Sequence, residues 1–275
     1  MIHVVTAANR ALYEPQLLEM HRSRTATFVE RRGWKNLKVA ADGGEYDEGD
    51  DEHAIYLISL TSGGRLDRSM RMRRTTDWSV LGSVFPHFVG PDEASVTNSD
   101  VWEMTRYCST GAAGEDESMR KRGEFQLAMM EKAVQCGIRR IVAITDLSLV
   151  ASQLRSGAPT RVIGLPGKYD EGEAVAIEVA PTAEKVEEFK ERLNIRSSAM
   201  LEFDETHPLC DLGPLQAEIF LDAIHHLTPA ACKLMTGITR TIADIEATEG
   251  VEAAIEAVER VREVIARDPA IRAIA

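Results

Sequence analysis

The order of apolar and polar positions divides the first 200 residues into short strand-like and helical segments. Alternating or continuous apolar runs predict strands at residues 2–6, 54–60, 66–72, 140–145, 160–163 and 172–179. Helical spacing predicts helices at residues 11–31, 116–136, 147–155 and 182–193, the second closed by Gly137 in a left-handed conformation. Because hairpin-like strands come first and helix-linked strands follow, the pattern predicts an α+β fold around a central sheet.

The end of the chain has a different pattern. Residues 214–228, 230–248 and 250–267 predict three helices. The last of them carries one apolar stripe, made of Val251, Ile255, Val258, Val261 and Ile265. Such a stripe has to be buried against another surface, so we expect these helices to cover the core or to form a homodimer interface.

Composition and charge narrow the class of protein. A chain of 275 residues with 44% hydrophobic residues can bury a full core. Its net charge of −12 disfavours non-specific nucleic-acid binding. The chain has no apolar run long enough to span a bilayer and no basic, apolar leader, so we expect a cytoplasmic protein without a membrane segment. The four cysteines form no C-x-x-C pair, which favours reduced thiols over a zinc or disulfide scaffold.

The charge is unevenly distributed. Between Ser118 and Lys168, nine cations stand against three anions. This surplus is compatible with a face that attracts an acidic partner, and equally with charges scattered over helix surfaces.

Aromatic and charged residues form five short motifs between Arg24 and Tyr107. The motifs are R-x-x-x-F-x-x-x-x-x-W (Arg24, Phe28, Trp34), E-x-D-x-x-D (Glu45, Asp47, Asp50), R-x-x-x-T-T (Arg71, Thr75, Thr76), V-F-P (Val84, Phe85, Pro86) and E-x-T-R-Y (Glu103, Thr105, Arg106, Tyr107). In this order and at these spacings, the chain resembles the LuxI-type acyl-homoserine-lactone synthases, the autoinducer synthase family.

The resemblance implies a fold and an activity. The fold is a GNAT-like N-acyltransferase αβα sandwich, with a core at residues 1–196 and a C-terminal helical extension of unknown role at 197–275. The activity is transfer of an acyl group from a thioester to the amine of S-adenosylmethionine. Lactonisation then releases 5′-methylthioadenosine, and the product serves quorum sensing.

S-adenosylmethionine presents a sulfonium, an amine, a carboxylate and an adenine, which call for acids, aromatic faces and a cation. The resemblance assigns its pocket to Arg24, Phe28, Trp34, Asp47, Asp50 and Tyr107, and it ties Glu45 and Arg71 into a polar network that orders the pocket. The alternatives are a solvated acidic loop at residues 45–52 and ordinary core packing for the aromatic residues.

Acyl transfer needs a neutral amine, so a nearby carboxylate must accept a proton. Glu103 is the candidate base, with Arg106 holding it or the neighbouring acids by charge-assisted hydrogen bonds. Strand alternation predicts that Glu103, Thr105 and Tyr107 share one side. The alternative is a purely structural Glu103–Arg106 pair.

An acyl chain needs an apolar slot. Candidates for its acyl and pantetheine contacts are Thr105, Val142, Ile144, Thr145 and Leu149, although apolar strand residues more often form plain core. Neither chemical step requires a metal or a resident cofactor. The substrates implied are S-adenosylmethionine and a thioester of coenzyme A or of an acyl carrier protein, and the sequence specifies neither this choice nor the acyl length.

Two other classes stay open at this stage. A general acetyl-CoA acetyltransferase normally carries Q/R-x-x-G-x-G/A after its central strand, whereas residues 108–114 read Cys-Ser-Thr-Gly-Ala-Ala-Gly. A non-catalytic binding or regulatory protein that gained a helical module is the second. Only a synthase would consume S-adenosylmethionine and release methylthioadenosine.

Overall fold

The computed structural model describes residues 2–61, 65–111, 115–169, 172–196, 198–203, 241–242 and 244–267. The chain divides into two compact units. Unit 1 comprises Met1–Ala7, Pro15–Ser59 and Leu66–Glu202, and unit 2 comprises Ala8–Glu14, Leu60–Arg65 and Phe203–Ala275.

The main sheet has nine described strands in the order β11-β1-β4-β5-β6-β7-β10-β8, with β9 also paired to β10. The bounds are β1 (Ile2–Val5), β4 (Ile55–Leu60), β5 (Leu66–Arg74), β6 (Val101–Ser109), β7 (Arg140–Asp146), β8 (Thr160–Val162), β9 (Gly167–Tyr169), β10 (Gly172–Val179) and β11 (Met200–Glu202). A separate ribbon pairs β2 (Lys38–Val39) with β3 (Glu45–Tyr46). The six predicted strands are confirmed, and β6 contains the segment from Glu103 to Tyr107 for which strand alternation was assumed. The strands without a prediction, β2, β3, β9 and β11, have two or three residues, too few to show a period.

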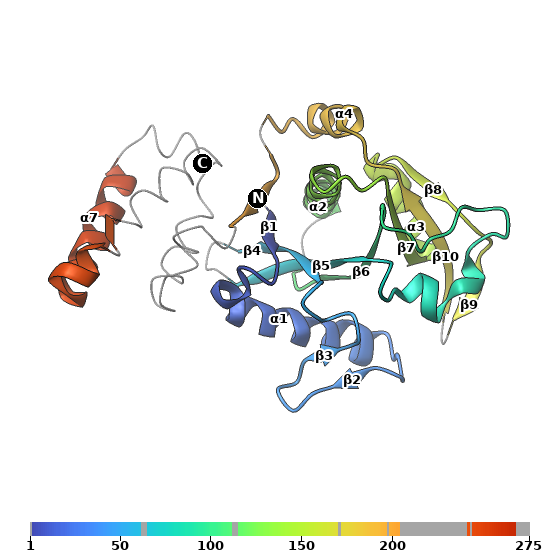
Figure 1. The fold of residues 1–275 in the computed structure, drawn as a ribbon, viewed down its shortest axis with the longest axis horizontal. Coiled ribbons are helices and arrows are strands. Elements are labelled where there is room, and N and C mark those ends of the chain that lie inside the picture. Colours follow the sequence, from blue (N-terminus) through green and yellow to red (C-terminus); the bar gives the residue numbers. More distant parts are fainter. Residues whose placement is uncertain are drawn as a thin grey trace. The chain divides into compact units, whose positions relative to one another are not determined.

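Helices cover both faces of the sheet (Figure 1). On one face lie α2 (Glu115–Gln135), α3 (Leu147–Ser156) and α4 (Ala183–Leu193). On the other lie α1 (Glu14–Arg24), which continues as the π-helix η2 (Thr25–Arg31), and the short helices η3 (Val80–Val84) and η4 (Pro86–Phe88); the 3₁₀ turn η1 (Arg10–Tyr13) precedes α1 in the sequence. The predicted α+β class with an αβα sandwich is confirmed.

The helix ends follow their local sequence. Gly137 ends α2 with a φ of 70°, as predicted, and Gly157 ends α3 with a φ of 85°. The Thr182 hydroxyl accepts a hydrogen bond from the Lys185 amide at 3.2 Å and so caps the start of α4. The faces of α2 and α4 that carry Phe125, Met130 and Phe189 then pack on the sheet as the main core.

The parallel pair β6–β7 is short. Its backbone pairing ends at Glu103↔Val142, although β6 continues to Ser109 and β7 to Asp146. Beyond that point β7 pairs only with β10. The two strands therefore form a fork, defined here as the point just after Glu103 and Val142 where they separate.

A β-bulge interrupts β6 beside β5. Ser69 is opposite Cys108 while Arg71 is opposite Thr105, so three steps on β6 match two on β5. Arg106 lies inside this bulge with a φ of 57°, a left-handed conformation that is uncommon outside glycine. The bulge changes which side chains of β6 share a face.

The helix α7 (Val251–Arg267) in unit 2 confirms the third predicted tail helix. Residues 241–242 and 244–249 are helical and match the end of the second, whereas the helix predicted at 214–228 lies outside the described residues. Val251 and Ile255 of the apolar stripe are exposed. The homodimer interface stays a prediction, and β11 shows that the sheet extends past the boundary predicted at residue 196.

Candidate active site

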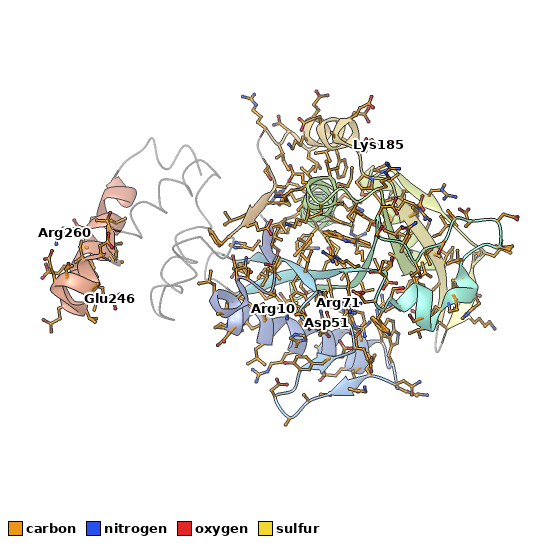
Figure 2. All side chains as sticks on the ribbon, viewed as in Figure 1. Arg10, Asp51, Arg71, Lys185, Glu246 and Arg260 are labelled. Atoms are coloured by element: carbon orange, nitrogen blue, oxygen red, sulfur yellow. The ribbon has the colours of Figure 1, made fainter. Side chains whose placement is uncertain are left out.

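Three arginines and three carboxylates form one buried polar network in unit 1. The arginines come from α1, β5 and β6, and the acids come from the segment around β3; its members are Arg24, Arg71, Arg106, Glu45, Asp47 and Asp50. Arg71 is labelled in Figure 2 near the middle of the unit. A buried charge is costly unless it is paired. This pairing explains how six ionised groups can lie inside the fold.

Arg71 is the centre of the network. Its guanidinium donates to both carboxylate oxygens of Asp47, at 3.0 Å from Nη2 to Oδ2, and reaches Asp50 Oδ1 at 3.0 Å. Its Nε also donates to the Thr105 hydroxyl at 3.1 Å. Arg24 donates from Nη1 to both oxygens of Asp50, at 2.8 and 2.9 Å. Arg71 therefore holds residues 45–50, called the acidic segment below, against the sheet.

Arg106 joins the network because of the β6 bulge. Its Nη2 lies 2.8 Å from Glu45 Oε1 and 2.7 Å from Asp47 Oδ2. In a regular strand Arg106 would point to the opposite face from Thr105. The bulge puts both side chains on one face, where Thr105 binds Arg71 and Arg106 binds Asp47. Of the two kinds of partner predicted for Arg106, Glu103 or the neighbouring acids, the structure shows contacts with the acids Glu45 and Asp47.

Asp47 and Asp50 of the network stay ionised. Burial alone would raise the pKa of Asp47, but the hydrogen bonds and charge of Arg71 outweigh it and hold the pKa below its usual value. For Asp50, burial is likewise outweighed by the charges of Arg24 and Arg71, so its pKa is also lowered. The alternative of a solvated loop is wrong for these two residues and for Glu45, which is fully buried; it holds for Glu48 and Glu52, which are exposed.

An aromatic platform lies beside the network. Phe28 and Trp34 stack with ring centroids 4.8 Å apart, and the Arg106 guanidinium carbon lies 5.5 Å from the centroid of Phe28. The end of η2 fixes this geometry, because Gly33 takes a φ of 73° and the Trp34 amide donates to the Phe28 carbonyl at 2.9 Å. Phe28 and Trp34 are thus brought together, and Arg106 connects them to Glu45, which also lies near Arg24.

Glu103 lies at the fork. It is buried, and its carboxylate accepts hydrogen bonds from the amides of Val80 at 2.7 Å and Leu81 at 2.5 Å, at the start of η3. Burial raises the pKa of Glu103 to about 7 despite these two bonds. A carboxyl group with that pKa is half ionised near neutral pH, which suits a general base.

Apolar residues gather on the same side of the fork. Val142 and Ile144 of β7 pack in a cluster with Leu81 of η3 and Phe88 of η4. This cluster is next to Glu103, whose strand partner is Val142. It offers an apolar surface beside a candidate base.

Comparisons with known proteins show the family to which this chain belongs. A family model described as autoinducer synthase matches residues 9–189. The chain belongs to the autoinducer synthase family. An isovaleryl-homoserine lactone synthase from Bradyrhizobium diazoefficiens is 29% identical over 201 residues, which cover 72% of this chain and 87% of that protein. An acyl-homoserine-lactone synthase from Rhizobium etli is 33% identical over 141 residues, covering 50% of this chain and 65% of the relative.

Solved structures of autoinducer synthases have the same fold. BjaI, a CoA-dependent acyl-homoserine lactone synthase solved with SAM and isopentyl-CoA, matches with a TM-score of 0.65 at 28% identity, covering 74% of this chain and 93% of that one. The family, the GNAT-like fold and the acyltransferase class predicted from the sequence are confirmed.

Tyr107 is not where strand alternation placed it. Beyond the bulge it points to the α2 face, where its hydroxyl accepts a hydrogen bond from Arg68 Nη1 at 2.9 Å and its ring meets Phe125 edge-on, with centroids 6.0 Å apart. The prediction that it shares a side with Glu103 and Thr105 is wrong, because the extra residue in β6 reverses the alternation. The structure does not bring Tyr107 together with Arg24 and Phe28.

The residues predicted for the acyl slot lie on two faces. Val142 and Ile144 point toward η3, whereas Thr145 alternates with them and pairs with Val175 on the α3 side. Leu149 belongs to α3 and is 36% exposed. Thr105 is bound by Arg71 inside the network. The structure therefore groups only Val142 and Ile144 of this set beside the fork.

The local surplus of cations is largely offset in space. Lys121 pairs with Asp67, Lys132 with Glu202, and Arg140 and Arg161 with Glu178, and all three acids lie outside residues 118–168. Sequence counting missed these partners because they are far apart along the chain. Scattered, locally paired charge is the better description of this segment.

Three site residues had no prediction. These are Arg32 and Tyr169, which both bind Asp146 and both lie beside Trp34, and Asp146 itself. Arg32 is two residues before Trp34, and Asp146 directly follows the strand predicted at residues 140–145, so position alone offered a weak signal. In the part of the chain that the structure describes, no group of three or more histidine, cysteine or acidic residues has a metal-binding arrangement, and no helix is long and apolar enough to cross a membrane.

Proposed function

We propose that this autoinducer synthase makes an acyl-homoserine lactone from S-adenosylmethionine and an acyl-CoA. The observation that carries the proposal is the position of Glu103 at the fork, between the polar network with its aromatic platform and the apolar cluster around Val142. A polar substrate and an apolar acyl chain would meet at this carboxylate.

The net charge of the site favours a cationic substrate. With Glu103 ionised, four carboxylates face the three arginines of the network, which leaves one negative charge in excess. S-adenosylmethionine carries one net positive charge, from its sulfonium, ammonium and carboxylate groups. The aromatic faces of Phe28 and Trp34 suit the sulfonium, since ring faces attract cations.

The chemistry then follows in two steps. Glu103, directly or through a water, accepts a proton from the substrate amine, and the freed nitrogen attacks the thioester carbonyl to expel the thiol. The methionyl carboxylate next attacks its own γ-carbon, and the carbon–sulfur bond breaks to release 5′-methylthioadenosine. Because the sulfonium is already an activated leaving group, folding the chain into the attacking geometry is the enzyme's main task in this step.

Glu103 also fits a purely structural role, because its carboxylate caps the first amides of η3. The pKa of Glu103, raised by burial to about 7, suits a base at neutral pH, and a variant that keeps the shape of the side chain but removes its basicity distinguishes this role from a cap.

Coenzyme A is the donor carrier we propose, because BjaI, a relative 28% identical to this chain, is CoA-dependent. An acyl carrier protein as donor is the alternative. The pairing of the cations in residues 118–168 weakens the case for a strongly acidic partner on that face.

The test supplies purified protein with S-adenosylmethionine and matched acyl chains on coenzyme A and on an acyl carrier protein. We expect methylthioadenosine and a lactone of matching acyl length with the CoA donors. Equal or faster turnover with the carrier protein would reverse the donor assignment. Binding of S-adenosylmethionine without methylthioadenosine from any donor would favour the non-catalytic alternative.

A further inference from the structure

Asp146 has an unusual position for an aspartate at a helix start. It is the N-cap residue of α3, where an aspartate ordinarily accepts a hydrogen bond from the helix amides, but its side chain makes no such cap. Its carboxylate instead accepts hydrogen bonds from Arg32, 114 residues away, and from the hydroxyl of Tyr169. The Asp146 side chain therefore binds Arg32 and Tyr169 instead of capping its own helix.

Both partners of Asp146 also contact Trp34. The guanidinium carbon of Arg32 lies 5.9 Å from the Trp34 ring centroid. The ring of Tyr169 meets Trp34 edge-on, with centroids 5.7 Å apart and planes at 90°. Trp34 is thus held by Phe28, Arg32 and Tyr169, and two of these three side chains are fixed by one carboxylate.

These contacts join the two sides of the fork. Arg32 and Trp34 follow η2, which carries Phe28 of the aromatic platform. Asp146 ends β7, and Tyr169 of β9 packs against the apolar cluster that contains Val142 and Phe88. Since β6 and β7 make no backbone pairs beyond Glu103↔Val142, side chains have to provide the connection there.

The hydroxyl of Tyr169 is suited to this contact. Burial and the hydrogen bond to Asp146 raise the pKa of Tyr169 to about 12, so the phenol keeps the proton that it donates. Arg32 and Asp146 are partly exposed, at 32% and 16% of their side chains, so solvent reaches this pair. A pair of this kind contributes little to global stability and can still fix a local geometry.

We propose that Arg32, Asp146 and Tyr169 form a clasp that positions Trp34 as the wall between S-adenosylmethionine and the acyl chain. The inference rests on the proposed function and adds three positioning residues to it. With the clasp intact, the aromatic platform is already in place when the substrate arrives, which lowers the cost of ordering it. Loosening the clasp should weaken binding of S-adenosylmethionine more than it slows the chemical steps.

The test compares Asp146→Asn, Arg32→Met and the double variant with the wild type. We expect each single variant to raise the Kd for S-adenosylmethionine, measured by calorimetry, by about tenfold. Its kcat at saturating substrate should change by less than about threefold, because Glu103 is untouched. The double variant should bind no more weakly than either single one, since both break the same clasp. Arg32→Lys keeps the charge and should recover part of the affinity.

The control is Glu93→Gln, which removes the partner of Arg161 in an exposed ion pair of the β8 region. Its Kd should equal that of the wild type, and thermal unfolding should show all variants folded. An unchanged Kd in Asp146→Asn, additive losses in the double variant, or a fall in kcat with an unchanged Kd would each overturn the clasp. If the wild type itself neither binds S-adenosylmethionine nor releases methylthioadenosine, the proposed function fails, and the clasp fails with it.

Discussion

The two sides of the fork are held together by different kinds of interaction. On one side, six paired charges hold the acidic segment and the aromatic platform through directional contacts, with most arginine-to-carboxylate distances near 3 Å. On the other, apolar side chains from β6, β7, β10, η3 and η4 pack without a specified direction. Charge pairs demand particular residue types at particular places, whereas apolar packing tolerates many combinations. Mutations on the polar side should therefore cause large losses of stability or activity. Mutations on the apolar side should mainly change which acyl chains are preferred.

The largest effect is expected at the centre of the polar network. Arg71→Met takes from Asp47 the guanidinium that binds both of its oxygens and leaves Asp50 with Arg24 alone, and loss of a partner from buried charges typically costs about 3–5 kcal/mol of unfolding free energy. Urea denaturation measures this loss. Arg161→Met removes a half-exposed arginine from Glu93 and Glu178, and because Glu178 keeps Arg140, this variant should lose only a small fraction of that free energy. Similar losses in both variants would contradict the contrast between the network and surface pairs.

The second effect concerns the residue at the fork. Glu103→Gln keeps the shape of the side chain and removes its basicity, so kcat should fall by about 10² or more while the protein stays folded. Glu178→Gln is the matched control, because Glu178 is also buried but pairs with Arg140 away from the site. Near-normal turnover in a folded Glu103→Gln protein would leave Glu103 as a cap of η3 and nothing more.

The contrast between the two sides also explains what the sequence could predict. Arg24, Asp47, Asp50 and Arg71 were assigned through the family resemblance, whose motifs are visible in the sequence because a network of charges needs particular residue types at particular spacings. The succession of long strands and helices was found because each shows a period over several residues. The acyl side had no comparable signal, since Val142 and Thr145 are equally compatible with core and slot until the strand faces are known.

The bulge in β6 shows a second limit. Strand alternation placed Tyr107 beside Glu103, but one extra residue at Arg106 reversed the faces beyond it. A non-glycine residue with positive φ leaves no mark in the sequence, because local preference disfavours it and the surrounding contacts impose it. Here the contacts of Arg106 with Glu45 and Asp47 accompany that conformation, and only the fold reveals them.

A third prediction sharpens the description of the apolar side. Ile144→Phe should fill the slot and shift preference toward acyl chains about two carbons shorter, by roughly 10-fold or more in kcat/KM, at about 0.8 kcal/mol per buried methylene. Thr145→Phe, one residue away on the opposite face, should leave the preference unchanged. Competition between CoA donors of graded length measures both. The reverse result would move the acyl slot to the α3 side.

The smallest effect is a dependence on pH. Burial raises the pKa of Glu103 to about 7, so the ionised fraction of this carboxyl rises about tenfold between pH 6 and pH 8. A base acts only when ionised, and kcat/KM for S-adenosylmethionine should therefore increase with pH across this window. The substrate amine loses its own proton near pH 8 and adds to the rise. The residual activity of Glu103→Gln should retain only that substrate contribution, and an unchanged profile in this variant would assign the ionisation to another group.

The most direct measurement follows two products in one reaction. Purified protein is supplied with S-adenosylmethionine and an accepted acyl-CoA, and free coenzyme A thiol and 5′-methylthioadenosine are quantified together over time. If the amine attacks the thioester and the methionyl carboxylate then closes the lactone, both products should accumulate in equal amounts. Thiol release without methylthioadenosine would indicate an acyltransferase that does not lactonise, and release of neither product would contradict the account of the site as a catalytic one.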